Sequence, residues 1–505
     1  MFGYEASLCH NSQSWIRIVS RMNDRGFRYG WPVAVVVIYA AAFLVYAENW
    51  AFTWDESYHL LAAQLINAGK RPYLDFCFPQ SPLNAYWNAG CMRLLGANWR
   101  APHAFAALFT IGAVALTARF VFLHFPAPGW RAAAALTAAL LTGLNAMVFI
   151  YGPLAQAYGI CLFTLVVAFR IAIRAVDRSG PLWPAAVGFF AGAAAASSLL
   201  LVAATPVLLA WMMFYNRAGS RGIKFCAFVV GTVIPFTPVI WLFWQGPQQA
   251  WFNLVQYHLF FRELYWPETT RHDLEVLTSW IDSGQALLIG LLALSGLLYI
   301  ARRSQWPASM KANFYLCAWL AAALAVEVGR AHPTFPRYFL LTVPFLAILA
   351  AVGLYAIASR VLEPDKPLWA VLPVVIFLVF GLAKSLYERR QVGNWSAYER
   401  LARKIDEVTP HNLLLFANEP IYFLTRRVPP PGLELSYSHE VDLGPAKNAL
   451  LHIVTSSEVK RQVQSGMFAT AYSCDEDDIS DYGLPNLYKQ RVDMEDCSIF
   501  WDRKK

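Results

Sequence analysis

Two adjacent carboxylates, Asp55 and Glu56, follow directly after the first long apolar segment of the chain. A carboxylate next to a bilayer is costly unless it faces water, a cation or a substrate. At such a position it can accept a proton from an attacking hydroxyl group, which is the role of a general base. The same pair is also typical of a helix N-terminus, with Asp55 as the cap of a helix over Ser57–Ala68. Both interpretations can hold at once.

Cationic and hydrogen-bonding residues occur in three other segments that flank apolar stretches. They are Lys70 and Arg71, then His258 and Arg262 at helical i, i+4 spacing, and then Arg330, His332, Arg337 and Tyr338. Guanidinium and ammonium groups at a membrane surface suit an anionic lipid headgroup such as a phosphate or pyrophosphate. For each residue alone, interfacial snorkelling is the alternative interpretation. As a set beside a carboxylate, they predict a phosphate-binding site. Glu327, deep in an apolar segment, could pair with one of these cations.

The elements that must hold these groups are membrane helices. Of the 505 residues, 57% are hydrophobic and 15% are charged, which is too little charge to cover the surface of a soluble protein of this length. Apolar runs of about 20 residues recur, each long enough to cross about 30 Å of hydrocarbon. The predicted spans, about eleven, are 31–48, 101–124, 131–149, 157–176, 183–197, 199–215, 223–244, 283–301, 312–329, 338–358 and 368–384.

The distribution of Lys and Arg predicts the sidedness of the loops. Alternate loops carry basic residues, for example Arg174 and Arg178, whereas the turns near 150–156 and 197–198 carry none. The net charge of +8 therefore reflects orientation in a bilayer, and nucleic acid is not an expected partner. The positive-inside rule places the N-terminus in the cytoplasm, provided that a hairpin divides the stretch 183–215. The predicted extracytoplasmic segments are 49–100, 245–282, 330–337 and 385–505.

This pattern predicts an all-α polytopic membrane protein in three parts. Residues 1–30 form a cytoplasmic segment, 31–384 a transmembrane catalytic module, and 385–505 an extracytoplasmic domain. In the first extracytoplasmic loop, 49–100, apolar residues at helical spacing predict two helices that lie along the membrane interface, Asp55–Ala68 and Leu83–Leu95. The tail predicts a small α/β domain with helices at Tyr398–Val408 and Glu419–Thr425 and strands at Leu413–Phe416 and Ala449–Val454.

The eight cysteines contain no CxxC metal pattern. On the predicted topology, four of them lie in an oxidising compartment: Cys77, Cys91, Cys474 and Cys497. We expect a disulfide between Cys474 and Cys497 and, with less support, one between Cys77 and Cys91. The alternative for both pairs is a buried free thiol.

Several short motifs resemble those of one glycosyltransferase superfamily. In the first loop they are Asp55-Glu56-Ser57-Tyr58, Gly69-Lys70-Arg71-Pro72-Tyr73-Leu74-Asp75-Phe76 and Ser81-Pro82-Leu83. Later ones are His332-Pro333-Thr334-Phe335-Pro336-Arg337-Tyr338 and, in the tail, Glu419-Pro420-Ile421-Tyr422-Phe423-Leu424. Together with the order of the spans, they resemble the GT-C glycosyltransferases. The nearest branch contains lipid A aminoarabinose transferases, protein mannosyltransferases and rhizobial lipopolysaccharide sugar transferases. The resemblance covers most of residues 30–435.

The resemblance implies a membrane enzyme that takes a sugar from a polyprenyl-phosphate donor. The acceptor would be a glycan, such as lipopolysaccharide, a glycolipid or a protein, and the location the bacterial inner (plasma) membrane. Asp55 would deprotonate the acceptor hydroxyl, which displaces the lipid phosphate with inversion at the sugar carbon. Arginines would stabilise the charge on the departing phosphate. Glu56 would orient the acceptor or hold a divalent cation; no cofactor is otherwise required.

One motif departs from this pattern. Gln80-Ser81-Pro82-Leu83 stands where aminoarabinose transferases tend to have Lys-Pro-Pro-Leu. A lysine that would contact phosphate is therefore absent, and its task would fall to Lys70, Arg71 or another cation.

Two other functions remain open from the sequence. A transporter or flippase of lipid-linked sugars would be expected to have internal repeats and polar sites at the membrane midplane. The chain has no convincing repeat, and its charged groups gather at one predicted surface. A scaffold without catalysis would be expected to have lost the acid, which this chain retains at Asp55.

Overall fold

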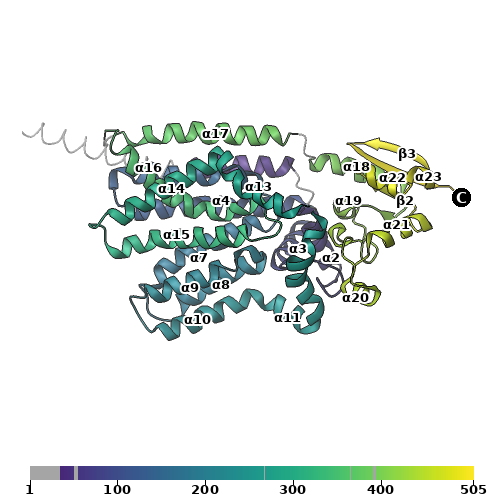
Figure 1. Ribbon diagram of the computed structural model, residues 1–505, viewed down its shortest axis with the longest axis horizontal. Coiled ribbons are helices and arrows are strands. Elements are labelled where there is room, and N and C mark those ends of the chain that lie inside the picture. Colours follow the sequence, from purple (N-terminus) through teal and green to yellow (C-terminus); the bar gives the residue numbers. More distant parts are fainter. Residues whose placement is uncertain (1–33, 51–54, 267, 364–365, 391–393, 505) are drawn as a thin grey trace, which may run out of the picture.

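The computed structural model describes residues 34–50, 55–266, 268–363, 366–390 and 394–504. The predicted cytoplasmic segment 1–30 and the first residues of the span 31–48 lie outside this part of the chain. The described residues form an elongated helical bundle with a small mixed domain at one end (Figure 1).

Seven helices in the described part of the chain are long and apolar enough to cross a membrane. They are α4 (Arg100–His124), α7 (Tyr158–Ala175), α10 with α11 (Arg221–Gln245), α14 (Gly284–Arg302), α15 (Ala308–Gly329), η6 with α16 (Pro336–Ala358) and η7 with α17 (Pro367–Glu388). Shorter apolar helices lie at Ala34–Asn49, Leu182–Ser197 (α8) and Leu199–Phe214 (η2 with α9). Each of these coincides with a predicted span.

The predicted span 131–149 is instead two helices, α5 (Arg131–Gly143) and α6 (Ala146–Tyr151). The side chain of Asn145 accepts hydrogen bonds from the backbone N–H groups of Met147 and Val148, at 3.1 and 3.3 Å. It therefore caps a new helix and interrupts the first one. The total of about eleven spans stays a prediction.

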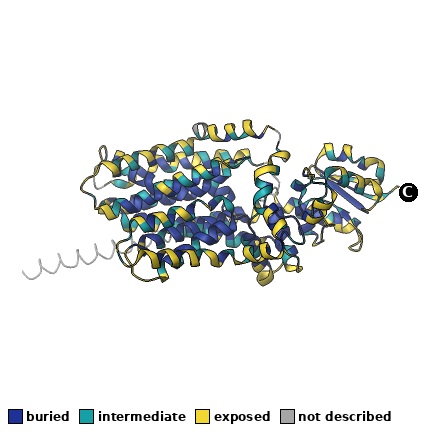
Figure 2. Cartoon of the chain, turned by 60° about the horizontal axis from the view of Figure 1, so that its bottom comes forward, coloured by how far each residue is buried: buried dark blue, intermediate teal, exposed yellow. Residues whose placement is uncertain are grey.

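The outward faces of the bundle are apolar. Figure 2 shows exposed residues along the outside of the long helices and buried residues between them. Among the exposed ones are Val230 of α10, Leu291 of α14 and Phe380 of α17, with 61%, 57% and 73% of their surface accessible. Side chains of this kind on a continuous surface are expected where a helix contacts lipid.

Small residues bring α8 and α10 into backbone contact. A Cβ atom at Gly188 would lie 2.0 Å from the carbonyl oxygen of Phe228, and one at Gly231 would lie 2.0 Å from that of Ala185. Gly188, Gly192 and Gly231 therefore allow the backbones of the two helices to approach closely.

The predicted hairpin within 183–215 is also confirmed. Helix α8 ends at Ser197 and α9 (Ala204–Phe214) begins after the short η2 (Leu199–Leu201). Tyr158, at the start of α7, and Ser198, at the end of α8, line the same cavity. The loop that joins α7 to α8 must then lie at the opposite end of the bundle.

The first loop forms both predicted helices, α2 (Glu56–Asn67) and α3 (Leu83–Leu95). That these helices lie along the membrane interface stays a prediction, but α2 is covered by protein rather than by water. Nine of its 12 residues are buried, His59 among them, and α19 (Glu419–Leu424) packs against it. Gln64 Nε2 donates to the carbonyl oxygen of Arg427 at 3.2 Å. Gln64 thus has its partner in the C-terminal domain, whereas Asn67 Nδ2 donates to the carbonyl oxygen of Ala89 in α3 at 2.9 Å.

The second loop crosses the same end of the bundle. It contains α12 (Pro247–Trp251), η4 (Phe252–Phe261), η5 (Arg262–Tyr265) and α13 (Thr269–Asp282). Phe252 and Tyr257 are buried, whereas Trp251 and Phe260 are exposed.

The C-terminal domain is an α/β unit, as predicted, but its strands differ. Its helices are α18 (Trp395–Val408), α19, η8 (Ser436–Ser438), α20 (Pro445–Leu451), α21 (Ser456–Ser465), α22 (Glu476–Asp481) and α23 (Leu484–Leu487). Its sheet has the order β1-β2-β4-β3, from β1 (Leu415–Phe416), β2 (Thr470–Ser473), β4 (Cys497–Arg503) and β3 (Tyr488–Met494). Only β1 and β2 are parallel.

The predicted strand Ala449–Val454 is wrong. Pro445, at the first position of α20, favours a helix start, and the helix continues to Leu451.

One predicted disulfide forms and the other does not. Cys474 and Cys497 are bonded to each other. Cys77 and Cys91 are free and buried, so their predicted pairing is wrong. Cys77 Sγ lies 3.5 Å from Asn253 Oδ1 in η4, whereas Cys91 belongs to α3. The Cys77 thiol thus has its polar contact in η4.

Candidate functional site

A cavity of about 590 Å³ opens at the end of the bundle that carries the C-terminal domain. Its wall is built from the start of α2, the α6–α7 and α8–α9 turns, η4 and η5, the loop before η6, the end of α17, and two residues of the C-terminal domain. The carboxyl, imidazole and guanidinium side chains in the wall belong to Asp55, His59, His258, Arg262, Glu327, Arg330, His332, Arg337 and Arg389. This volume is typical of small-molecule sites.

Asp55 faces this cavity. It occupies the N-cap position of α2, but its side chain makes no capping hydrogen bond. Its Oδ2 atom instead accepts a hydrogen bond from Arg337 Nη2 at 2.9 Å. A quarter of the Asp55 side chain is exposed (25%), against 12% for Arg337. The capping interaction expected from the sequence is therefore absent, and the carboxylate is directed to a cation in the wall.

Arg337, Tyr338 and Arg262 form an aromatic and cationic cluster beside Asp55. The Arg337 guanidinium lies 4.0 Å from the ring centre of Phe335, and the Arg262 guanidinium lies 5.6 Å from that of Tyr338. Arg262 Nη2 donates to the Tyr338 hydroxyl group. Stacking on an aromatic face holds each guanidinium in place, and an anion is bound at the edge of such a group.

The two histidines nearest this cluster are neutral. Burial and the neighbouring Arg262 lower the pKa of His258 to about 3. Burial lowers the pKa of His59 to about 4, against the opposing effect of Asp55. His258 can therefore donate or accept a hydrogen bond in the cavity, but it does not supply the positive charge expected from the sequence.

His332 and Arg330 line the outer part of the cavity. His332 Nδ1 lies 2.6 Å from Asp273 Oδ2, and its Nε2 lies 3.1 Å from Glu263 Oε2. The hydrogen bond to Asp273 is the main reason that the pKa of His332 is raised. Its charge is thus already paired within the protein. Glu327 also reaches the cavity, where its Oε2 accepts from the backbone N–H of Ala203 at 2.9 Å. It contacts the start of α9, and its expected cationic partner is not observed among the described contacts.

Lys70 and Arg71 do not line the cavity. Lys70 Nζ lies 3.9 Å from Glu434 Oε1 of the C-terminal domain. Arg71 makes a bidentate pair with Asp75, with both nitrogen–oxygen distances at 2.9 Å. Neither residue therefore reaches the cavity described here, and their predicted phosphate contacts stay a prediction.

Glu56 is likewise absent from the cavity wall. It is fully buried behind Asp55, where its Oε1 accepts from the backbone N–H of Ala155 at 2.8 Å and contacts His103 Nε2.

Sequence reasoning missed Arg389, Tyr151 and Tyr437. Arg389 follows α17, and its Nη2 donates to the hydroxyl group of Tyr151 in α6. Its guanidinium lies 4.8 Å from the Tyr151 ring centre. A signal was present, because Arg389 and Arg390 follow a span at the end where the positive-inside rule disfavours cations. Tyr437 comes from the C-terminal domain, and its carbonyl oxygen accepts from the Tyr257 hydroxyl at 3.3 Å. No local pattern indicated that contact.

The described residues contain no cluster of three or more His, Cys, Asp or Glu side chains arranged to hold a metal ion.

Comparison with known proteins identifies the fold. The chain matches no protein-family model and no curated protein sequence. Among solved structures, it superimposes on apo ArnT from Cupriavidus metallidurans with a TM-score of 0.67 at 15% identity, over 93% of this chain and 97% of ArnT. The chain has the ArnT fold.

ArnT bound to undecaprenyl phosphate gives a TM-score of 0.66 at 14% identity, over 93% of this chain and 98% of that one. The Archaeoglobus fulgidus oligosaccharyltransferase tethered to an acceptor peptide gives 0.52 at 12% identity, over 92% of this chain and 73% of that one. ArnT and this oligosaccharyltransferase are both GT-C glycosyltransferases, so the resemblance read from the sequence motifs is confirmed at the level of the fold.

Proposed function

We propose that the chain is a membrane glycosyltransferase that moves a sugar from a polyprenyl-phosphate donor to a hydroxyl group of an extracytoplasmic acceptor, with Asp55 as the general base. The observation that carries the proposal is that Asp55 shares one cavity wall with Arg262 and Arg337 in a chain with the ArnT fold. A protein of this fold binds undecaprenyl phosphate, which supports the same class of donor here.

The charges of the cavity wall suit this reaction. Four arginines, Arg262, Arg330, Arg337 and Arg389, outnumber the two carboxylates, Asp55 and Glu327. When the bond between the sugar carbon and the phosphate oxygen breaks, the lipid phosphate gains a second negative charge. Guanidinium groups already held in place stabilise that charge without reorganisation. We assign the phosphate to Arg262 and Tyr338, since Arg262 makes no ion pair with a carboxylate among the described contacts.

The general-base step then falls to Asp55. The acceptor oxygen attacks the anomeric carbon from the side opposite the phosphate, and its proton passes to the Asp55 carboxylate. Displacement from the opposite side inverts the configuration at that carbon. Because Arg337 is bonded to Asp55, the reaction also requires this ion pair to open or to share the carboxylate with the acceptor hydroxyl.

One side of the cavity is apolar and suits contact with the lipid part of the donor. Leu254 and Leu259 of η4 and Leu199 and Leu200 of η2 line the cavity. Leu259 is 65% exposed, so this wall continues onto the outer surface of the bundle. A polyprenyl chain could leave the cavity there and remain in the bilayer.

The location follows from the charges of the loops. The cavity lies at one end of the bundle, and the loop with Arg178 lies at the other. By the positive-inside rule, the cavity and the C-terminal domain face the extracytoplasmic side of the membrane. The likeness to ArnT supports the bacterial inner membrane as that membrane. The acceptor would then be an envelope glycan, a glycolipid or a protein.

The test uses the purified chain in liposomes with undecaprenyl phosphate that carries a radiolabelled sugar, together with an envelope extract as the source of acceptor. If the chain transfers the sugar, the label leaves the lipid and joins the acceptor while undecaprenyl phosphate is released. Label that crosses the bilayer on an intact donor would instead indicate a flippase. Mass spectrometry of envelope glycans from a deletion strain and its parent would name the sugar and the acceptor.

A further inference from the structure

Glu56 has a set of contacts that the transfer reaction does not use. Its carboxylate is fully buried, and so is its partner His103 of α4. His103 Nδ1 lies 2.6 Å from the carbonyl oxygen of Ala47, at the end of the helix Ala34–Asn49. On the other side of the ring, Nε2 contacts Glu56 Oε1. The imidazole thus lies between a carbonyl oxygen and a carboxyl oxygen.

The carbonyl oxygen of Ala47 and the carboxyl oxygen of Glu56 determine how many protons Glu56 and His103 hold together. A carbonyl oxygen cannot donate, so Nδ1 must carry a proton that it donates to Ala47. If Nε2 were then bare and Glu56 ionised, two lone pairs would face each other in a buried space. A second proton must therefore lie between Nε2 and Oε1, whether it resides on the imidazolium or on the carboxylic acid. Either way, the pair of Glu56 and His103 carries no net charge.

The same carboxyl oxygen fixes the loop between α6 and α7. Glu56 Oε1 accepts from the N–H group of Ala155, while the carbonyl oxygen of Ala155 accepts from Asn84 and Asn88 of α3, at 3.3 and 2.8 Å. The next residue, Gln156, lines the cavity. Glu56 therefore connects the first turn of α2 to α4 and to a segment of the cavity wall.

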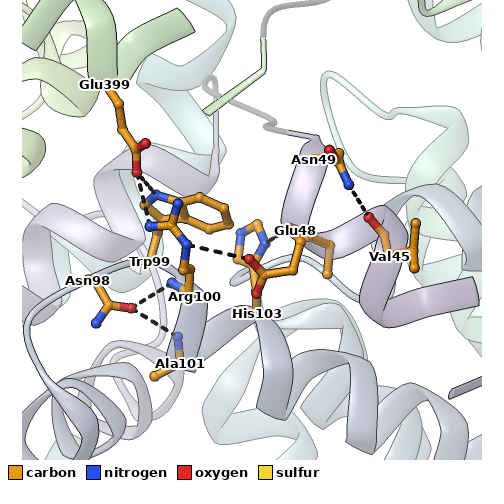
Figure 3. A network of polar contacts seen from close by, with 10 residues as sticks. Val45, Glu48, Asn49, Asn98, Trp99, Arg100, Ala101, His103 and Glu399 are labelled. Atoms are coloured by element: carbon orange, nitrogen blue, oxygen red, sulfur yellow. Dashed lines mark hydrogen bonds and ion pairs between the residues drawn. The ribbon is translucent and has the colours of Figure 1, made fainter. Parts of the chain in front are cut away.

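His103 lies beside a junction of three segments, to which Glu48, Arg100 and Glu399 belong (Figure 3). The ring of Trp99 stacks on that of Trp395 in the C-terminal domain, with centres 5.4 Å apart, and the edge of the His103 ring meets Trp99 at 5.1 Å. Arg100 joins Glu48 and Glu399, at 3.4 and 3.0 Å. The junction holds the imidazole rigidly, and the imidazole holds Glu56.

We propose that Glu56 and His103 form a buried clamp that shares one proton and positions Asp55 in the cavity wall. Asp55 is the residue directly before Glu56, and its own side chain does not cap α2. Its direction therefore depends on the backbone that Glu56 fixes. Because the pair has no net charge, Glu56 adds no uncompensated negative charge beside Asp55 that would weaken its interaction with Arg337. Glu56 is a positioning residue in this account, and the activity part of the proposal rests on the proposed function.

The kinetic test compares Glu56→Gln with Glu56→Ala in the full-length purified protein. Because Oε1 of Glu56 makes both contacts, the amide of Gln at that place can either accept from Ala155 or donate to a neutral His103, so it keeps one half of the clamp without its charge. We expect Glu56→Ala and His103→Ala to lower kcat about tenfold or more with little change in the KM for the donor, and Glu56→Gln to restore part of kcat. His124→Gln is the matched control, since His124 also lies in α4 and contacts a backbone carbonyl, that of Phe120, at 3.0 Å.

A spectroscopic test does not depend on transferase activity. In protein labelled with ¹⁵N-histidine, the His103 signals are identified by their loss in His103→Gln. We expect wild-type His103 to show a protonated Nδ1 and a proton at or shared by Nε2, and Glu56→Gln to show a bare Nε2 with Nδ1 still protonated. A bare Nε2 beside an ionised Glu56 carboxylate in the wild type would overturn the shared proton, even if sugar transfer were absent. If Glu56→Gln were as inactive as Glu56→Ala while still folded, Glu56 would be a catalytic group or cation ligand and the positioning role would be wrong. If the alanine variants fail to fold, Glu56→Gln and the spectrum decide.

Discussion

Arg337 Nη2 lies 2.9 Å from Asp55 Oδ2, across 282 positions of the sequence. This ion pair joins the first loop to the segment before α16 and places a guanidinium beside the proposed base. The guanidinium is also stacked on Phe335. It can therefore hold the carboxylate before the acceptor arrives and remain in the wall when the acceptor hydroxyl replaces it.

The first prediction concerns Arg337. We expect Arg337→Ala to lower kcat by about 10²- to 10³-fold, because a preorganised cation at the reacting centre is lost. Arg337→Lys should recover part of this loss, since an ammonium keeps the charge but not the planar stacking. The measurement is steady-state transfer with each variant. A kcat within twofold of wild type for Arg337→Ala would show that the pair has no role in the reaction.

The second prediction concerns the proposed phosphate contact of Arg262 and Tyr338. Arg262→Ala should lower kcat/KM by about 10²- to 10³-fold. Tyr338→Phe removes only the hydroxyl group that orients Arg262 and should cost about tenfold, the effect of one hydrogen bond to a charged group. Because the two side chains contact each other, the double variant should lose less than the product of the single losses. Fully multiplicative losses would mean that they bind different parts of the substrates.

The third prediction separates Lys70 and Arg71 from the active site. We expect Lys70→Ala and Arg71→Ala to keep transfer within about twofold of wild type, since neither residue reaches the cavity and distant surface changes usually have small effects. Burial raises the pKa of Glu434, the partner of Lys70, to about 7. Loss of Lys70 should therefore lower stability more above that pH than below it, where Glu434 is protonated. A large loss of activity in either variant, with the fold intact, would return these residues to the phosphate site.

The fourth prediction concerns pH and His332. Its hydrogen bonds to Asp273 and Glu263 raise its pKa above 6.5. A raised pKa in the folded state means that the stabilisation is fully present below about pH 6.5 and is lost as the pH rises through the raised value. Because 41% of the side chain is exposed, the contribution should stay below about 1 kcal/mol. His332→Gln should lower the Tm more at about pH 5.5 than at about pH 8.5, and the exposed His411→Gln is the control. An equal decrease at both pH values would contradict the account.

The sequence predicts this fold well where local patterns decide the structure. Apolar length identifies the long helices, and charge in the loops requires the hairpin at Ser197-Ser198, which the structure contains. The sequence is a poorer guide to turns that lack the residues by which such turns are usually recognised. The hairpin of β3 and β4 turns at Glu495 and Asp496, both with positive φ, without the Asn-Gly or Asp-Gly signal that marks such turns.

The sequence identified the site residues that could be recognised from their type and from the predicted side of the membrane on which they lie. Asp55, Arg262, Arg337 and Tyr338 occur in segments on one predicted side and meet in one cavity. The partners of Lys70 and Glu56 could not be predicted in this way. Lys70 pairs with Glu434, and Glu56 pairs with His103. These partners are distant in the sequence and are brought together by packing around α2. Pairings of that kind depend on tertiary packing, which a single sequence does not display.

The central claim is that Asp55 is the general base, and one substitution tests it most directly. Asp55→Asn keeps the size of the side chain and can still contact Arg337 through its amide oxygen, but it cannot accept the acceptor proton. Sugar transfer from undecaprenyl-phosphate donor by the purified, folded variant should fall by about 10²- to 10⁴-fold, while donor binding stays close to that of wild type. Transfer at the wild-type rate by Asp55→Asn would contradict the account.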